Sequence, residues 1–188
     1  MRDKTFLAAE IRAVLRLARI VEVDGRHPRA AASRQWAPLL CAYSGARIQE
    51  VCWLEKSHVW NEEGIFVMRF PMTKDGMART VPIHDALIRE GLLEFWKNAP
   101  DGALFTGDRP PKPGVTRPPA EQRASDVAAW ISASIELDEV LSPNHAWRHT
   151  FITRAEGAGI SKRMANALAG HNRRRDASTA TTRRRFPS

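Results

Sequence analysis

The sequence predicts a mainly α-helical domain that carries a small, three-stranded antiparallel β-sheet. Two observations indicate this fold class. Apolar residues recur at helical spacing up to residue 54 and again from residue 85 onwards, whereas between residues 59 and 83 they stand in short runs separated by turn residues. With 188 residues, the chain is long enough for one domain with a sizeable core.

The first part of the chain is expected to form three helices. Residues 5–23 have apolar side chains at helical spacing after Thr5, which can cap the helix. A polar break around Gly25 precedes a second helix, which ends near Gly45. A short third helix is expected from about residue 46 to residue 54.

The middle of the chain is expected to form the sheet. Strands are predicted at residues 59–60, 65–70 and 79–83. Residues 61–64 supply the first turn. The second turn contains Thr73-Lys74-Asp75-Gly76, whose Asp-Gly pair is a strong hairpin signal.

Helical spacing returns in the second half of the chain. Residues 107–119 are rich in Pro, Gly and Arg and are expected to form a surface loop. Asn144, which follows Pro143, is expected to cap one of the later helices. The expected helices are residues 85–97, 121–136, 144–157 and 161–169.

The charge balance indicates a polyanionic partner. Lys and Arg outnumber Asp and Glu by 29 to 21, and the isoelectric point is near 10.3. A basic surface gains free energy by releasing counterions from phosphates, so nucleic acid is the expected partner. No apolar stretch is long enough to cross a membrane, and the N-terminus lacks the apolar core of a signal peptide. The expected localisation is therefore cytoplasmic.

Metal binding is not expected. Cys41 and Cys52 are too few for a disulfide framework or a complete cysteine zinc site, and both are interpreted as small buried hydrophobes. His145 and His149 lie four residues apart on one expected helix, but Ala146 stands where a metalloprotease helix has Glu.

The C-terminal residues differ in composition from the rest. Residues 172–188 contain two Arg triplets, the first formed by Arg173, Arg174 and Arg175, among Ser, Thr and Ala. We therefore expect a domain at residues 1–171 and a poorly ordered basic tail at 172–188. The tail could lie along DNA phosphates or be an ordinary solvated terminus, and composition does not separate the two.

Four groups of residues carry candidate chemistry, and each has a plainer interpretation. An Arg and a Glu at a helix start could be a surface ion pair, and a Lys in a turn could simply be solvated. A His and an Arg three apart share a helix face and could both face solvent, and a His after a glycine could cap a helix C-terminus. These groups are Arg47 with Glu50, Lys74, His145 with Arg148, and His171.

In this order and at these spacings, the four groups resemble the catalytic domain of the tyrosine recombinase, or phage integrase, family. The pattern is Gly-Ala-Arg-x-x-Glu, a Lys in a β-hairpin, His-x-x-Arg on a helix and a later Gly-His, and it runs over nearly the whole chain. The resemblance implies the predicted fold class and a role in DNA recombination or integration. Double-stranded DNA would be the partner, other recombinase protomers are further candidates, and no small-molecule substrate or cofactor is implied.

The resemblance also implies the roles of three residues around the phosphate. The family cleaves DNA through attack by a tyrosine hydroxyl on a backbone phosphate, without metal or ATP. Arg47 and Arg148 would clamp the non-bridging oxygens, on which negative charge grows in the transition state. Glu50 would hold Arg47 in place rather than react.

The remaining roles concern proton transfer and the nucleophile. By resemblance, Lys74 would protonate the leaving 5′-oxygen, His145 would assist proton transfer and His171 would donate a hydrogen bond to the phosphate. The segment that should hold the nucleophile has no tyrosine, and Thr182 stands at the aligned position. A threonine hydroxyl has a higher pKa and a shorter reach, and a misplacement of about 1 Å can cost about two orders of magnitude in rate. We therefore predict that this chain does not cleave DNA on its own.

Two other functions remain open at this point. The first is a non-catalytic DNA-binding protein that retains the recombinase fold and regulates or assists an active relative. The second is a basic structural or RNA-binding domain in which the motif residues are coincidental.

Overall fold

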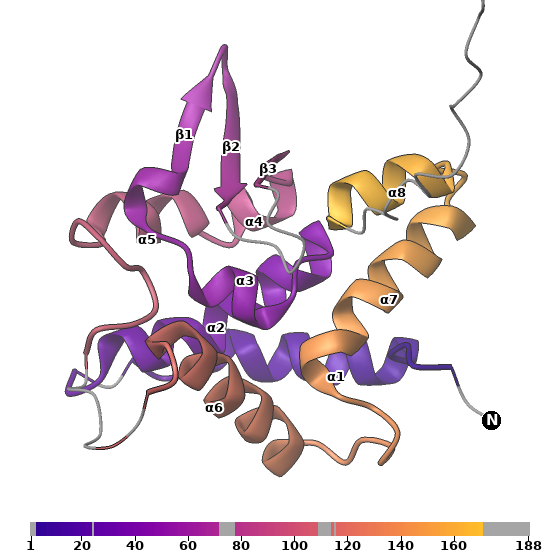
Figure 1. The fold of residues 1–188 in the computed structure, drawn as a ribbon, viewed down its shortest axis with the longest axis horizontal. Coiled ribbons are helices and arrows are strands. Elements are labelled where there is room, and N and C mark those ends of the chain that lie inside the picture. Colours follow the sequence, from indigo (N-terminus) through magenta and orange to yellow (C-terminus); the bar gives the residue numbers. More distant parts are fainter. Residues whose placement is uncertain (1–2, 24, 72–77, 109–113, 115, 171–188) are drawn as a thin grey trace, which may run out of the picture.

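The computed structural model describes residues 3–23, 25–71, 78–108, 114 and 116–170. These residues form a mainly helical domain with a three-stranded antiparallel sheet at one side (Figure 1), so the predicted fold class is confirmed. The candidate site residues Lys74, His171 and Thr182, and the triplet Arg173 to Arg175, lie outside the described residues.

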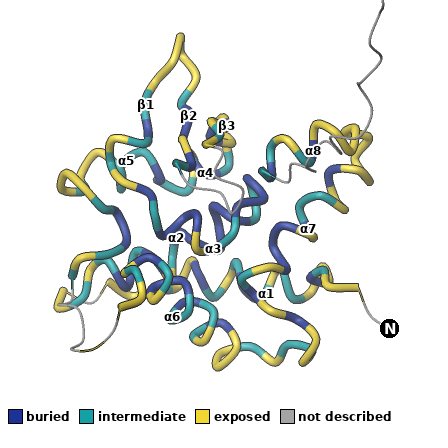
Figure 2. Tube along the Cα trace, in the orientation of Figure 1, coloured by how far each residue is buried: buried dark blue, intermediate teal, exposed yellow. Residues whose placement is uncertain are grey.

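Helix α2 (Pro28–Ser44) lies at the centre of the helical part. It begins with Pro28, whose fixed φ and missing N–H suit the first helical position. It contacts α1 (Ala8–Arg19), α3 (Ile48–Cys52), α6 (Pro119–Ser134) and α7 (Pro143–Gly157). Because neighbours cover it on several sides, most of its residues are buried (Figure 2), including the unbroken run of residues 36–41.

Helix α1 begins later than the sequence pattern suggested. The prediction that Thr5 caps this helix is wrong, because Leu7 is the N-cap and its N–H donates to Glu10. Phe6 is buried beside Trp147, with ring centroids 4.7 Å apart, and its N–H donates to Thr150 Oγ1 at 2.8 Å. The contact with α7 holds residue 6 outside the helix.

The sheet consists of β1 (Val59–Glu62), β2 (Ile65–Phe70) and β3 (Arg79–Pro82) in the order β1-β2-β3. Both pairings are antiparallel, with Val59 opposite Met68 and Met68 opposite Val81. The three predicted strands are therefore confirmed, and β1 extends two residues into the expected turn.

The prediction of one continuous helix over residues 85–97 is wrong. The segment forms two helices, α4 (Asp85–Arg89) and α5 (Leu92–Asn98), which Gly91 separates with a φ of 92°. Glycine adopts this left-handed conformation without a steric penalty, so the chain changes direction there.

The last two helices lie close to their expected positions. Helix α7 has Ser142 as N-cap and Pro143 as its first residue, so the expected cap at Asn144 is two residues too late. Helix α8 (Lys162–Ala169) is capped by Ser161, whose side chain accepts from the N–H of Met164, and ends at Gly170.

Both cysteines are buried and free, which confirms their interpretation as small core residues. Burial raises the pKa of the Cys52 thiol to about 12 and also raises that of Cys41 well above its ordinary value. Within the described part of the chain, none of the helices has the length and apolar character needed to cross a membrane.

Candidate functional site

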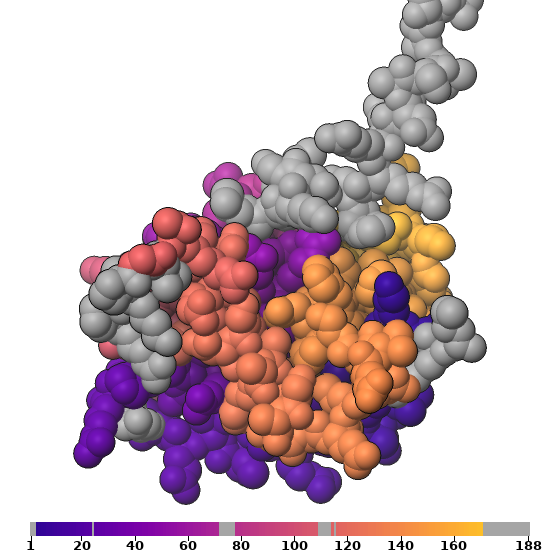
Figure 3. Space-filling model, turned by 60° about the horizontal axis from the view of Figure 1, so that its bottom comes forward, coloured from indigo at the N-terminus to yellow at the C-terminus, as the bar shows by residue number. Residues whose placement is uncertain are grey.

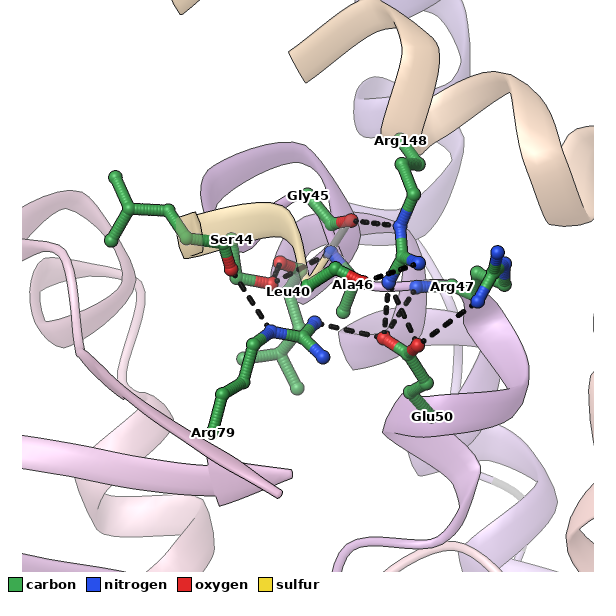
Figure 4. A network of polar contacts seen from close by, with 10 residues as sticks. Leu40, Ser44, Gly45, Ala46, Arg47, Glu50, Arg79 and Arg148 are labelled. Atoms are coloured by element: carbon green, nitrogen blue, oxygen red, sulfur yellow. Dashed lines mark hydrogen bonds and ion pairs between the residues drawn. The ribbon is translucent and has the colours of Figure 1, made fainter. Parts of the chain in front are cut away.

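The carboxylate of Glu50 is the centre of a buried ionic cluster (Figure 4). It accepts hydrogen bonds from Arg47 Nη1 at 3.4 Å, from Arg79 Nη2 at 2.8 Å and from Arg148 Nη2 at 2.7 Å. Glu50 is 4% exposed, so the interpretation of Arg47 and Glu50 as a surface ion pair is wrong. One carboxylate holds three guanidinium groups, which leaves a formal charge of +2 in the cluster.

Local backbone geometry brings Glu50 to this place. Arg47 is the N-cap of α3, and its N–H donates to the Glu50 carboxylate at 3.2 Å. This bond satisfies a donor that the first turn of a helix leaves free, so Glu50 holds the helix start and the arginines together.

The corner between α2 and α3 needs a glycine. Gly45 has a φ of +66°, and a Cβ there would lie 2.6 Å from the Phe151 ring on α7. The same residue offers its carbonyl to Arg148 Nε at 3.1 Å. The glycine therefore allows α7 to approach closely enough for Arg148 to reach the cluster.

Arg148 is almost completely enclosed. Its residue exposure is 3%, and its guanidinium donates to Gly45, Glu50 and, at 3.3 Å, the carbonyl of Gly170. Burial lowers the pKa of Arg148 from its ordinary value, and the nearby Glu50 carboxylate opposes that shift.

Arg47 is the most accessible arginine of the cluster. Its side chain is 20% exposed, compared with 9% for Arg79 and 4% for Arg148. It lines a cleft of about 190 Å³ together with the exposed His145. The cleft lies where α3, α6 and α7 meet, and Figure 3 shows α6 and α7 side by side at the surface. The other lining residues are Gln49, Arg117, Glu121, Ala124, Ser125 and Asn144.

The structure thus brings part of the expected site together. Arg47, Glu50 and Arg148 belong to one hydrogen-bonded cluster, and His145 shares a cleft with Arg47. Lys74 and His171 lie outside the described residues. In the sequence, Lys74 stands between β2 and β3, and His171 follows Gly170. Among the described residues, no group of three or more His, Cys, Asp or Glu side chains could hold a metal ion.

Sequence reasoning missed Arg79. Its side chain donates to Glu50 and to the carbonyl of Leu168, and its Cζ lies 4.5 Å from the centre of the Phe70 ring. A signal was present, because Arg79 alternates with Val81 in β3 and with Ile83 just after it, and both of these are buried. A charge on a buried strand face requires a partner.

The helical domain with its small sheet, and the arginines gathered on one carboxylate, define the class of tyrosine recombinase catalytic domains. The chain belongs to the phage integrase family, whose family model matches residues 10–182. A comparison with curated proteins finds no match.

Solved structures of other proteins share this fold. One is the XerH site-specific recombinase bound to difH substrate, in a pre-cleavage complex, with a TM-score of 0.60 and 16% identity over 91% of this chain and 48% of that chain. Another is the Tn1549 transposon integrase in complex with circular intermediate DNA, with a TM-score of 0.58 and 20% identity over 92% of this chain and 61% of that chain. The chain spans about half the length of the XerH chain, and the likeness shows the fold.

Proposed function

We propose that the chain is a DNA recombination or integration domain that grips a backbone phosphate of double-stranded DNA. The carrying observation is the Glu50 cluster, in which one carboxylate holds three arginines beside the cleft that Arg47 and His145 share. Preorganised cations of this kind stabilise the charge that grows on a phosphate during strand transfer. Relatives of this fold bound to DNA, such as XerH, support the same assignment.

The roles differ with accessibility. Arg47 has the more open guanidinium and makes the first contact with the phosphate, while Arg148 sits behind it and supplies positive charge. His145 assists proton transfer from the side of α7. Lys74 is the general acid and His171 a hydrogen-bond donor, as the family pattern implies.

By the family pattern, the sequence has no tyrosine at the position of the nucleophile. Its one tyrosine is Tyr43, which packs on His84 with ring centroids 4.8 Å apart. Tyr43 lines a separate, largely apolar cavity of about 360 Å³ with residues such as Ile11 and Phe151, away from the cleft of Arg47. By the family pattern, Thr182 is the residue that aligns with the expected tyrosine. We therefore propose that the chain binds DNA without cleaving it. A protein of this kind could regulate or assist an active relative, or act together with other recombinase protomers.

This function is tested by separating binding from covalent attachment. The full chain should retard mixed-sequence duplex DNA in a native gel, with an affinity that falls as salt rises. After denaturation, no protein should remain attached to the DNA. Failure to bind at low salt would contradict the phosphate-binding role. A covalent protein–DNA adduct would contradict the proposal that the chain does not cleave DNA.

The basic triplet Arg173 to Arg175 gives a second prediction. If these side chains contact phosphates, replacing all three with Gln should reduce the slope of log affinity against log salt concentration by up to about three. Filter binding at several salt concentrations measures this slope. An unchanged slope means that the triplet is an ordinary solvated segment.

A further inference from the structure

A carboxylate stands in the wall of the cleft that is proposed to receive a DNA phosphate. The cleft of about 190 Å³ is lined by two arginines, Arg47 and Arg117, and Glu121 is the one carboxylate among the described residues that line it. A phosphate and a carboxylate repel each other, so the gripping of a phosphate does not by itself require Glu121.

The Glu121 carboxylate is held in this wall by two other segments of the chain. Its Oε1 accepts a hydrogen bond from Gln49 Nε2 on α3 at 3.1 Å, and its Oε2 lies 4.0 Å from Arg117 Nε. Arg117 Nη1 in turn donates to Ser125 Oγ at 3.4 Å. The side chains of Arg117 and Glu121 are 53% and 41% exposed, so water weakens their attraction. The charge of the carboxylate is therefore still felt by a group in the cleft.

This carboxylate acts on phosphates according to their charge. A phosphodiester inside a DNA strand carries one negative charge, whereas a terminal phosphate monoester carries about two at pH 8, because it loses its second proton near pH 6. The arginines alone would favour the monoester, since electrostatic attraction grows in proportion to the charge of the ligand. Repulsion by Glu121 grows in the same proportion and offsets this preference.

We infer that Glu121 is a specificity-determining residue, whose carboxylate lowers the affinity of the cleft for terminal or free phosphate monoesters relative to the phosphodiesters of an intact strand. The inference rests on the proposed phosphate-binding function. It reserves the cleft beside Arg47 for internal positions of DNA rather than for strand ends.

Titration of the full chain at pH 8 and low salt with two small phosphates tests this inference. Dimethyl phosphate stands for the diester and methyl phosphate for the monoester, and the side-chain signal of Arg47 in nuclear magnetic resonance reports occupation of the cleft. The variant is Glu121→Gln, which removes the charge but keeps a side-chain oxygen that can accept from Gln49 Nε2. The matched control is Glu136→Gln, at an exposed position beyond the opposite end of α6.

In Glu121→Gln, the affinity for dimethyl phosphate should rise about threefold to tenfold. This is the effect of two unit charges roughly 6 Å apart at a dielectric between those of a protein surface and bulk water. The affinity for methyl phosphate should rise by the square of that factor, about tenfold to a hundredfold, because its charge is twice as large. Glu136→Gln should change neither affinity by more than about twofold, since its charge lies about 20 Å away along the helix.

An equal rise for the two small phosphates in Glu121→Gln overturns the inference. No change for either ligand also overturns it and leaves Glu121 as a link between α3 and α6. A wild-type chain whose Arg47 signal shifts with duplex DNA but with neither small phosphate overturns it as well. If duplex DNA does not shift the Arg47 signal of the wild-type chain, the proposed function itself fails.

Discussion

Replacing Glu50 with Gln is expected to lower the free energy of unfolding by about 3–5 kcal/mol. The substitution keeps the size of the side chain but removes the single anion among Arg47, Arg79 and Arg148. The three guanidinium groups would then lie together with no anion between them, and a buried charge without a partner is costly. Glu50 is 4% exposed, and water therefore cannot take over the role of the carboxylate.

Urea unfolding followed by circular dichroism measures this change. The matched control is Glu94→Gln, which removes one negative charge from an exposed position on α5. The control should stay within about 0.5 kcal/mol of the wild-type protein. If Glu50→Gln is equally mild, Glu50 does not hold the arginines together.

Replacing Arg47 with Ala is expected to weaken binding to duplex DNA at low salt by roughly tenfold to a hundredfold, the equivalent of one charge-assisted hydrogen bond. The fold should tolerate this change better than the loss of Arg148, since Arg47 makes the longest of the three contacts with Glu50, at 3.4 Å, and is more exposed than Arg148. Fluorescence anisotropy with a labelled duplex measures the affinity.

The control for this experiment is Arg12→Ala, which removes one positive charge from the exposed side of α1. Loss of net charge alone should weaken binding equally in both variants. A specific role of Arg47 requires a clearly larger effect than that of Arg12→Ala. Equal effects would leave the binding as a general property of a basic surface.

The sequence predicted the elements whose signals are local. The strands were found because short apolar runs and the Asp75-Gly76 pair mark them directly. The later start of α1 could not be found in this way, because it depends on the contact of Phe6 with Thr150, 144 residues away. The sequence shows a glycine at position 91, but a glycine alone does not predict that the helix ends there. The helix ends because the chain changes direction at Gly91, where φ is 92°.

The sequence likewise predicted only part of the candidate site. Arg47, Glu50 and Arg148 were recognised from an ordered pattern, and the structure brings them together. Arg79 was missed because its partners, Glu50 and the Leu168 carbonyl, lie 29 and 89 residues away. Its alternation with buried residues in β3 and just after it indicates that Arg79 needs a buried partner. That conclusion requires knowing which neighbouring residues are buried, which only the structure shows.

The central claim is that the cleft beside the Glu50 cluster binds a DNA phosphate, and nuclear magnetic resonance tests it most directly. Isotope-labelled protein is titrated at low salt with a short duplex of mixed sequence, and the side-chain signals of Arg47 and His145 are followed. The account predicts that both signals shift together as the duplex is added, whereas that of Arg12 on α1 changes little. Saturable shifts elsewhere, with Arg47 and His145 unchanged, would contradict it.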